Sequence, residues 1–350
     1  MYIVIAILIF GLLITVHELG HFSAAKLMKV KVNEFAIGMG PAIFKKQGKE
    51  TLYSLRVLPL GGYCAIEGED GESEDEGSMA KRPLWQRLII LFAGAFMNFL
   101  VGFIIVVIIL SASDYYATTT INGFMEGFPL EGESGLMVGD RVTAVDGHSV
   151  HLFSEFSLYM GRSDGESVDL KLVRDGKQVE LKDFPLILRD YTVDGQTVRK
   201  YGLTFGVEEM TFGHLLEQGW YNATYFVKMV WMGLGDLVSG RAGLKEMSGA
   251  VGVVAAINEV GEQSENVQEG LLNVFYLGAF IAVNLAVMNL LPIPGLDGGH
   301  IFTMIISSII ALFIGHKPDP KYERVIHGAG LVLLIALMVV ITVSDVIKLF

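Results

Sequence analysis

Four long apolar segments stand out in the pattern of hydrophobic and polar residues along the chain. The first begins at Met1 and contains no charged residue before His17. The others cover roughly residues 88–110, 271–291 and 325–343. A helix needs about 20 apolar residues to cross the hydrocarbon core of a bilayer. The pattern therefore predicts a polytopic α-helical membrane protein with about four transmembrane helices.

Composition supports this class and excludes others. Hydrophobic residues make up 52% of the chain and charged residues 18%, with a mean hydropathy of +0.50. The chain is therefore too apolar for an ordinary soluble protein of this length. Its net charge of -12 argues against binding to nucleic acid. The single cysteine, Cys64, excludes an intramolecular disulfide and a multi-cysteine metal site, so we interpret it as structural.

Lysine and arginine predict how the spans are oriented. No basic residue precedes the first span, so we interpret it as a retained span rather than a signal peptide. Ten basic residues lie between Lys26 and Arg87, and the connection at 311–324 carries three more. Basic residues concentrate in short cytoplasmic loops. We therefore expect both termini outside and the 26–87 loop inside.

Two glycine-containing segments between the first two spans predict a β-hairpin. Residues 33–41 and 51–66 are apolar and rich in strand formers. One interpretation is a re-entrant hairpin whose edge pairs with an extended substrate, and the other is a cytoplasmic hairpin that packs under the helices. Residues 67–76 follow with seven acidic side chains, which predict a solvated linker.

A segment of different character, residues 115–207, predicts a small, mainly β domain. Asp-Gly pairs recur as turn signals, and apolar residues alternate with polar ones over residues 168–172. Residues 135–147 resemble the core of a PDZ domain, a fold that takes up extended peptides or chain termini by adding a strand. We interpret the nearby His148 and His151 as surface residues rather than metal ligands.

Two further segments carry weaker signals. Residues 212–238 combine aromatic and charged residues, which predicts one or two interfacial amphipathic helices, with a linker packed on the β domain as the alternative. In the second span, Gly94 and Gly102 permit close helix contact, and Asn98 needs a partner in lipid. We interpret them as a packing site with an interhelical hydrogen bond.

The sequence His17-Glu18-Leu19-Gly20-His21 carries the strongest chemical signal. On a helix, residues four positions apart lie on one face, so both imidazoles can bind one metal ion while Glu18 lies beside them. This pentapeptide occurs by chance on surface helices. Here it lies at the end of an uncharged apolar run, where ionisable side chains are costly unless they serve a function.

A second constellation, residues 289–300, supplies candidates for a third ligand. A catalytic zinc ion takes three protein ligands and leaves one position for water, so HExxH needs another donor. The candidates in or beside the spans are Asp297, His300 and His327. An isolated Asp at a helix end is usually a cap, but an intramembrane HExxH motif favours Asp297.

Six segments together resemble the site-2 protease family. They are HELGH, FAIGMGP, GAFMN, the PDZ-like insert, MSGAVG at residues 247–252 and NLLPIPGLDGG, and they occur in the family's order over nearly the whole chain. The chain looks most similar to the bacterial branch called regulator of sigma-E protease, with one PDZ domain. It departs from the family at Ala95 and Ala250, where members often have proline, which puts local backbone shape in doubt but not the chemistry.

The resemblance implies a zinc-dependent intramembrane endopeptidase of the bacterial cytoplasmic membrane. Its substrates would be transmembrane segments of single-span proteins, such as anti-sigma factors or signal-peptide remnants. The implied roles are Zn²⁺ ligands for His17, His21 and Asp297, general base for Glu18, and substrate-backbone binding for Asn284 and Asn289.

The predicted domain order follows from these assignments. Residues 1–114 hold the first two spans and a re-entrant hairpin, and 115–207 form an extracytoplasmic PDZ-like domain that could bind a peptide or chain terminus. Residues 208–270 form interfacial helices, and residues 271–350 form the last two spans.

Two other functional classes compete with the protease hypothesis. A transporter would favour internal repeats, which we do not find, and a catalytically inactive adaptor would not need HExxH together with Asp297.

Overall fold

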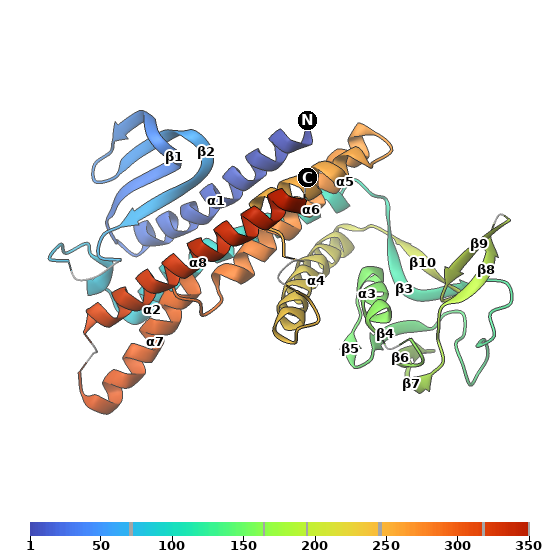
Figure 1. The fold of residues 1–350 in the computed structure, drawn as a ribbon. Coiled ribbons are helices and arrows are strands. Elements are labelled where there is room, and N and C mark those ends of the chain that lie inside the picture. The colour runs from blue at the N-terminus through green and yellow to red at the C-terminus, as the bar shows by residue number, and fades with distance from the viewer. Residues whose placement is uncertain (70–72, 164, 194, 244–246, 317–318, 349–350) are drawn as a thin grey trace. The chain divides into compact units, whose positions relative to one another are not determined.

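A computed structural model describes residues 1–350 except 70–72, 164, 194, 244–246, 317–318 and 349–350. Parts of the expected acidic linker and two of the Asp-Gly turns therefore lie outside the described residues. The chain forms two compact units: Met1–Val106 with Phe226–Phe350, and Val107–Tyr225 (Figure 1).

The first unit is built mainly from long helices. Its elements are α1 (Tyr2–Leu27), β1 (Val32–Gln47), β2 (Leu52–Ile66), a 3-10 turn (Met79–Lys81), α2 (Leu84–Leu110), α5 (Ala250–Glu262), α6 (Val267–Asn289), α7 (Asp297–Ile314) and α8 (Pro320–Lys348). The last residues of α2 and the first half of α4 (Phe212–Val238) belong to the second unit. Where the sequence predicts one or two helices over residues 212–238, the structure has a single helix, α4.

Five of the described helices are long and apolar enough to cross a membrane: α1, α2, α6, α7 and residues 321–348 of α8. The sequence analysis counted four, because it treated Asp297–His300 as the close of the third span and residues 311–324 as a connection. The structure instead begins a new helix, α7, at Asp297, directly after a loop at residues 290–296 that contains two prolines. The added helix is the other half of an apolar segment that this loop interrupts.

The hairpin of β1 and β2 forms where the sequence predicts it, but β1 continues six residues beyond Pro41. Residues 34–37 of β1 pair with residues 62–65 and also lie beside residues 52–55. The later part of β1 pairs with residues 52–56 as well. Each strand therefore bends back on itself, and the first half of β1 is enclosed between the two halves of β2. Residues 62–65 are left at one edge.

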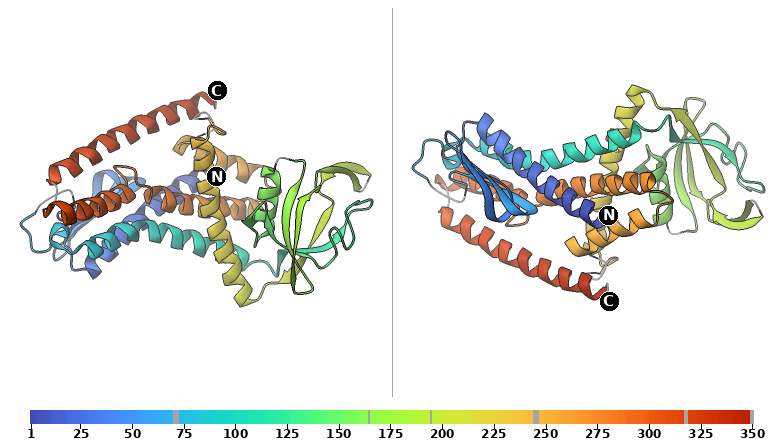
Figure 2. Two further views of the ribbon diagram at one scale, coloured as in Figure 1. Left: turned by 90° about the horizontal axis from the view of Figure 1, so that it is seen from below. Right: turned by 90° about the horizontal axis from the view of Figure 1, so that it is seen from above.

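This edge of the hairpin lies along α1 (Figures 1 and 2). A Cβ atom at Gly11 would come within 2.2 Å of the Pro59 carbonyl oxygen, so only glycine fits there. Further along the helix, a Cβ atom at Gly62 would lie 3.9 Å from Cγ of Glu18. Strand β2 thus follows α1 from the apolar run to the HExxH motif.

Small residues let α1, α2 and α6 approach closely, as expected for the second span. A Cβ atom at Gly20 would lie 2.3 Å from the Ala93 carbonyl oxygen, and one at Gly102 would lie 2.9 Å from that of Ala279. The packing prediction is therefore confirmed, but the hydrogen bond expected of Asn98 is not found. Its side chain is buried, and Oδ1 has no hydrogen-bond partner among the described residues.

Besides its parts of α2 and α4, the second unit contains a six-stranded sheet, one further helix and a separate hairpin. Its elements are β3 (Tyr115–Phe124), β4 (Arg141–Val145), β5 (His148–Ser149), α3 (Phe153–Arg162), β6 (Val168–Arg174), β7 (Lys177–Phe184), β8 (Arg189–Val193), β9 (Gln196–Lys200) and β10 (Leu203–Glu209). The sheet has the order β10-β3-β4-β6-β7 with β5 paired to β4, and β8 pairs with β9.

Local sequence explains this sheet. Val168, Leu170 and Leu172 alternate into the core as predicted, and the alternate residues are exposed. Asp146 and Asp175 have positive φ angles, as do the glycines that follow them, which is the backbone of tight hairpin turns. The predicted mainly β character of this segment is therefore observed.

Candidate metal centre

The HExxH motif lies on α1 as the sequence predicts. His17 and His21 are one turn apart, both are buried, and their ring centroids are 4.6 Å apart at an interplanar angle of 87°. An uninterrupted run of apolar residues forms the turns before them. A regular helix holds the two imidazoles on one face, as two ligands of one ion require.

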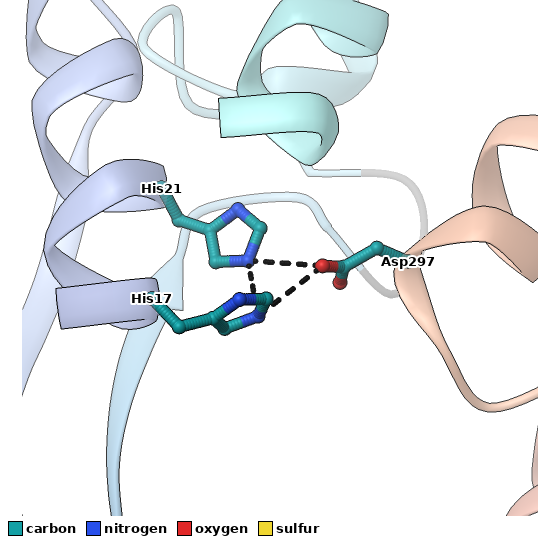
Figure 3. A group of neighbouring side chains, drawn as sticks. All are labelled: His17, His21 and Asp297. Carbon is teal, nitrogen blue, oxygen red and sulfur yellow. Dashed lines mark hydrogen bonds and ion pairs between the residues drawn. The ribbon is translucent and has the colours of Figure 1, made fainter. Parts of the chain in front are cut away.

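Asp297 approaches the histidines from the first turn of α7 (Figure 3). Its Oδ2 lies 3.2 Å from Nε2 of His17 and 3.3 Å from Nε2 of His21. Gly295, with a φ angle of +96°, turns the chain just before the carboxylate. Pro292, Pro294 and Gly295 therefore lie in the turn that delivers Asp297.

A hydrogen bond fixes which nitrogen of His21 faces Asp297. Its Nδ1 lies 2.8 Å from the carbonyl oxygen of Ile90 on α2. A carbonyl oxygen only accepts, so Nδ1 carries the proton and Nε2 keeps its lone pair. This is the usual arrangement of a metal-binding histidine, whose other nitrogen is anchored to a backbone carbonyl or a carboxylate.

The spacing of these atoms fits a zinc ion. The two Nε2 atoms are 3.1 Å apart, and each lies 3.2 to 3.3 Å from Oδ2 of Asp297. Ligands placed about 2.0 Å from zinc at tetrahedral angles lie about 3.3 Å from one another. Oδ2 is buried and has no hydrogen-bond partner in the described part of the chain, so its charge is directed at this position. The three residues thus provide the donor set of a catalytic site with a fourth position open.

Gly94 on α2 closes the other side of the site. A Cβ atom there would lie 2.3 Å from Nε2 of His21 and 2.7 Å from Cε1 of His17. Any larger residue would therefore displace the imidazoles. Gly94 is a packing residue, as predicted, and the surface it packs against includes the two candidate ligands His17 and His21.

Glu18 lies beside the three ligands and contacts the hairpin. It is half-buried and close enough to His17, His21 and Asp297 to interact with them electrostatically. The backbone of Cys64 on β2 is also close enough to influence this carboxylate. The edge of the hairpin therefore lies beside the predicted general base.

The other predicted site residues are distributed unevenly around this centre. Asn289, at the end of α6, has its Nδ2 3.5 Å from Nδ1 of His17, whereas no contact of Asn284 with the site is seen among the described residues. His300 and His327, the alternative ligand candidates, stack on each other at a centroid distance of 3.7 Å. They do not belong to the metal-binding group that His17, His21 and Asp297 form.

Sequence reasoning missed the backbone groups of the site. The Ile90 carbonyl orients His21, and the Cys64 backbone lies close to Glu18. Neither depends on the side chain of its residue, so no residue type could have indicated it. The only available signal was indirect, in the small residues Gly20 and Gly94, which mark where two helices approach closely enough to share such contacts.

Comparison with known proteins gives the same chemistry. Residues 5–337 match peptidase family M50. A candidate zinc metalloprotease of Fusobacterium nucleatum is 34% identical over 99% of this chain and 98% of its own length. One from Clostridium perfringens is 36% identical over 99% of both chains. The regulator of sigma-W protease RasP of Bacillus subtilis is 25% identical over 98% of both chains.

These matches extend over nearly the whole chain, well beyond the metal-binding motif. They include both segments that meet at the candidate metal centre, residues 17–21 and Asp297. The long apolar helices agree with a multi-pass protein in a lipid bilayer. The chain therefore belongs to peptidase family M50, the site-2 proteases, and is a zinc-dependent membrane metalloendopeptidase.

Proposed function

We propose that the chain is an intramembrane protease that cleaves the transmembrane segments of single-span membrane proteins, such as anti-sigma factors or signal-peptide remnants. His17, His21 and Asp297 bind the zinc ion and Glu18 is the general base. The observation that carries this proposal is the meeting of three ligand atoms from two apolar helices, 3.1 to 3.3 Å apart. The name of the Bacillus relative, a regulator of sigma-W protease, supports a substrate in sigma-factor signalling.

The residues of the site divide the reaction between them. When bound, zinc supplies a Lewis acid that lowers the pKa of a coordinated water towards about 7. Glu18 takes the proton of the attacking water as its oxygen adds to the scissile carbonyl carbon. As the C–N bond breaks, Glu18 returns that proton to the leaving amine. The edge of the hairpin lies beside this carboxylate during both transfers.

The hairpin provides a place for an unwound substrate. A peptide bond in a helix is shielded by its hydrogen bonds, so a transmembrane substrate must unfold locally before it reacts. Residues 62–65 form a strand edge beside Glu18, and added strands use such edges. The contact between Pro59 and Gly11, within the apolar run of α1, supports a re-entrant hairpin rather than a cytoplasmic one.

The two asparagines have separate roles in this proposal. Asn289 lies beside His17 and can hold both that ligand and the backbone of the substrate next to it. Asn284 lies almost one and a half helical turns earlier on α6, where it would bind the substrate further from the scissile bond. Its assignment depends on the family resemblance alone.

The second unit, which includes the PDZ-like segment, selects substrates in this proposal. Strand β10 pairs only with β3 among the described strands, which leaves its other edge available for an added strand. Phe205 on β10 packs against Phe153 and Phe156 of α3. A nearby pocket includes Arg199 and Tyr201, and a cationic side chain suits a peptide's terminal carboxylate.

The proposed location is the bacterial cytoplasmic membrane, with the second unit and both termini outside. Asn289 and Asp297 both reach the histidines of α1, so α6 and α7 would share one crossing that their connecting loop interrupts. This arrangement retains the predicted four crossings.

The proposed orientation can be tested by labelling. Single cysteines at Glu76 and Gln178, in a Cys64→Ser background, would be labelled from inside and outside respectively. The reverse pattern would overturn this orientation.

The functional proposal is tested by separating proton transfer from metal binding. Glu18→Gln keeps the size of the side chain but removes the base, so zinc should remain near one per chain while cleavage falls by several decades. Asp297→Asn weakens a charged ligand, so zinc content and cleavage should fall together, as they should for substitutions of His17 or His21. Zinc is measured by mass spectrometry and cleavage of a single-span substrate in liposomes, on the same preparations.

Glu76→Gln is the matched control, because this glutamate is exposed and lies away from the site. Full activity in Glu18→Gln would overturn the assigned base. Undiminished zinc in Asp297→Asn would remove Asp297 from the ligand set. Zinc binding without cleavage of any membrane substrate by the unmodified chain would favour the inactive adaptor.

A further inference from the structure

The C-terminal part of the first unit contains a histidine that no step of the proposed reaction uses. His327 lies on α8 and its side chain is buried. Its Nδ1 is 3.2 Å from the backbone nitrogen of Gly295, and its Nε2 is 3.0 Å from Oγ1 of Thr303 on α7. Its ring stacks on that of His300, with an interplanar angle of 6°. One side chain thus joins α8 to both the loop before Asp297 and the helix after it.

The directions of these hydrogen bonds define the state of His327. The backbone N–H of Gly295 can only donate, so Nδ1 of His327 must accept and carries no proton. The ring proton of the neutral imidazole is then on Nε2 and is donated to Oγ1 of Thr303. The hydroxyl of Thr303 in turn donates to the carbonyl oxygen of His300. Every polar atom in this chain of contacts is satisfied by one tautomer.

The backbone around Gly295 leaves little room for another arrangement. A Cβ atom at Gly330 of α8 would lie 2.2 Å from the Pro294 carbonyl oxygen, so helix and loop are in direct contact. Gly295 itself has the left-handed φ angle that turns the chain toward Asp297, and its hypothetical Cβ atom would lie 3.1 Å from the backbone nitrogen of Leu331. The loop is therefore packed directly against α8.

We propose that His327 is a positioning residue for the metal centre. By accepting the Gly295 N–H, it holds the turn that places the carboxylate of Asp297 against His17 and His21. The inference rests on the proposed role of Asp297 as a zinc ligand. Through this hydrogen bond, α8 increases the affinity of the site for zinc although it contributes no ligand. Groups that orient metal ligands typically contribute 10- to 100-fold to metal affinity.

Two substitutions of His327 separate its hydrogen bond from its bulk. In His327→Asn, the Oδ1 atom occupies the place of Nδ1 and can still accept the Gly295 N–H. In His327→Phe, the ring can still stack on His300, but neither hydrogen bond remains. Thr303→Val removes only the partner of Nε2, and His300→Phe keeps the stacking while removing the other imidazole. Each variant is made in the full chain and purified in detergent.

The readout is zinc affinity, measured by competition with a chelator of known affinity, together with the absorption spectrum of the cobalt-substituted protein. His327→Phe should weaken zinc binding by about 10- to 100-fold and alter the cobalt spectrum. His327→Asn should stay within about threefold of the original affinity. Thr303→Val and His300→Phe should have smaller effects than His327→Phe. Thermal unfolding without metal shows whether each variant is folded.

Several results would overturn the proposal. Unchanged affinity in His327→Phe would show that the contact does not influence the site, and equal losses in the Phe and Asn variants would show that bulk, not the hydrogen bond, matters. Asp297→Asn is measured in parallel. If it loses zinc while His327→Phe does not, the inference fails and the functional proposal stands. If it retains zinc, the ligand assignment and the inference fail together.

Discussion

Asp297 in the first unit and Asp140 in the second unit each have a carboxylate oxygen shielded from solvent, but their surroundings differ. Asp140 accepts hydrogen bonds from the backbone of Met137 and from two nitrogens of Arg174, all between 2.7 and 2.8 Å. Oδ2 of Asp297 has no hydrogen-bond donor among the described residues and faces two imidazole nitrogens. Guanidinium and backbone donors thus hold the carboxylate of Asp140, whereas Oδ2 of Asp297 faces the two imidazole nitrogens that we propose as zinc ligands.

Asp345, near the end of α8, is grouped with Asp140 because it faces backbone N–H groups and a lysine instead of imidazoles. Its Oδ1 has no hydrogen-bond partner among the described residues but lies 3.6 Å from Nζ of Lys348. Its Oδ2 accepts the backbone N–H groups of Gly249 and Gly252 at the start of α5, at 2.8 and 2.9 Å. A carboxylate at a helix N-terminus satisfies N–H groups that have no partner within the helix. The comparison therefore predicts that only changes around Asp297 affect zinc, while changes around Asp140 and Asp345 affect stability.

The largest effect is expected at Gly94. A side chain there would collide with both imidazoles, so Gly94→Leu should remove zinc and lower cleavage by at least about 100-fold. Gly328→Ala is the matched control, because this glycine is also in a long apolar helix but has no atom within 4 Å of its hypothetical Cβ among the described residues. Equal zinc content in the two variants would contradict the geometry of the site.

Asp140→Ala should destabilise the second unit without affecting the metal centre. It removes one partner of a buried ion pair, for which a loss of about 3 to 5 kcal/mol is typical. Hydrogen exchange over residues 115–209 of the full chain measures the loss, and zinc content should not change. Lys171→Ala breaks an exposed pair with Glu180 and should cost less than about 1 kcal/mol. Loss of zinc from Asp140→Ala would break the distinction between the two carboxylates.

A smaller effect is expected for Asp345→Ala. Loss of a helix cap typically costs about 1 to 2 kcal/mol, so the melting temperature in detergent should fall by a few degrees while zinc stays bound. Asp345→Asn retains an acceptor oxygen and should lose less. If both variants lost zinc at unchanged stability, Asp345 would have to be grouped with Asp297 instead.

The smallest effect concerns Tyr116 in the second unit. Burial, together with the hydrogen bond to the carboxylate of Glu208, raises the pKa of Tyr116 to about 12. The fold therefore favours the neutral phenol, and this contribution is complete below about pH 10 and is lost as the pH rises through 12. The difference in ultraviolet absorbance between the unmodified protein and Tyr116→Phe should titrate near pH 12. A titration near pH 10 would show that the contact with Glu208 is absent.

How far the sequence predicts the molecule depends on the kind of feature. The spans, the hairpin and the HExxH helix follow from periodicity and from the cost of charge in lipid, which are local properties. Asp297 could be identified as one of three candidates for the third zinc ligand, because a catalytic zinc site needs a third protein donor. Helix α7 was missed since a Pro- and Gly-containing loop divides one apolar segment into two shorter pieces.

The contacts that orient the ligands could not be predicted, because they depend on how distant segments pack. Nothing in the residue type of Ile90 indicates that its carbonyl anchors His21, and the sequence offered His327 only as a possible ligand. Its position beside Gly295 follows from the approach of α8 to the loop, which the structure alone reveals.

The separation of the ligands along the chain has a consequence for synthesis. Asp297 lies 280 positions after His17, so a ribosome that adds about 5 to 20 residues per second needs roughly 15 to 60 s to complete the ligand set. Throughout that interval the nascent chain carries HExxH in its first span but has only two of the three ligands. On the proposed assignment, the zinc site is therefore incomplete until the third ligand has been synthesised.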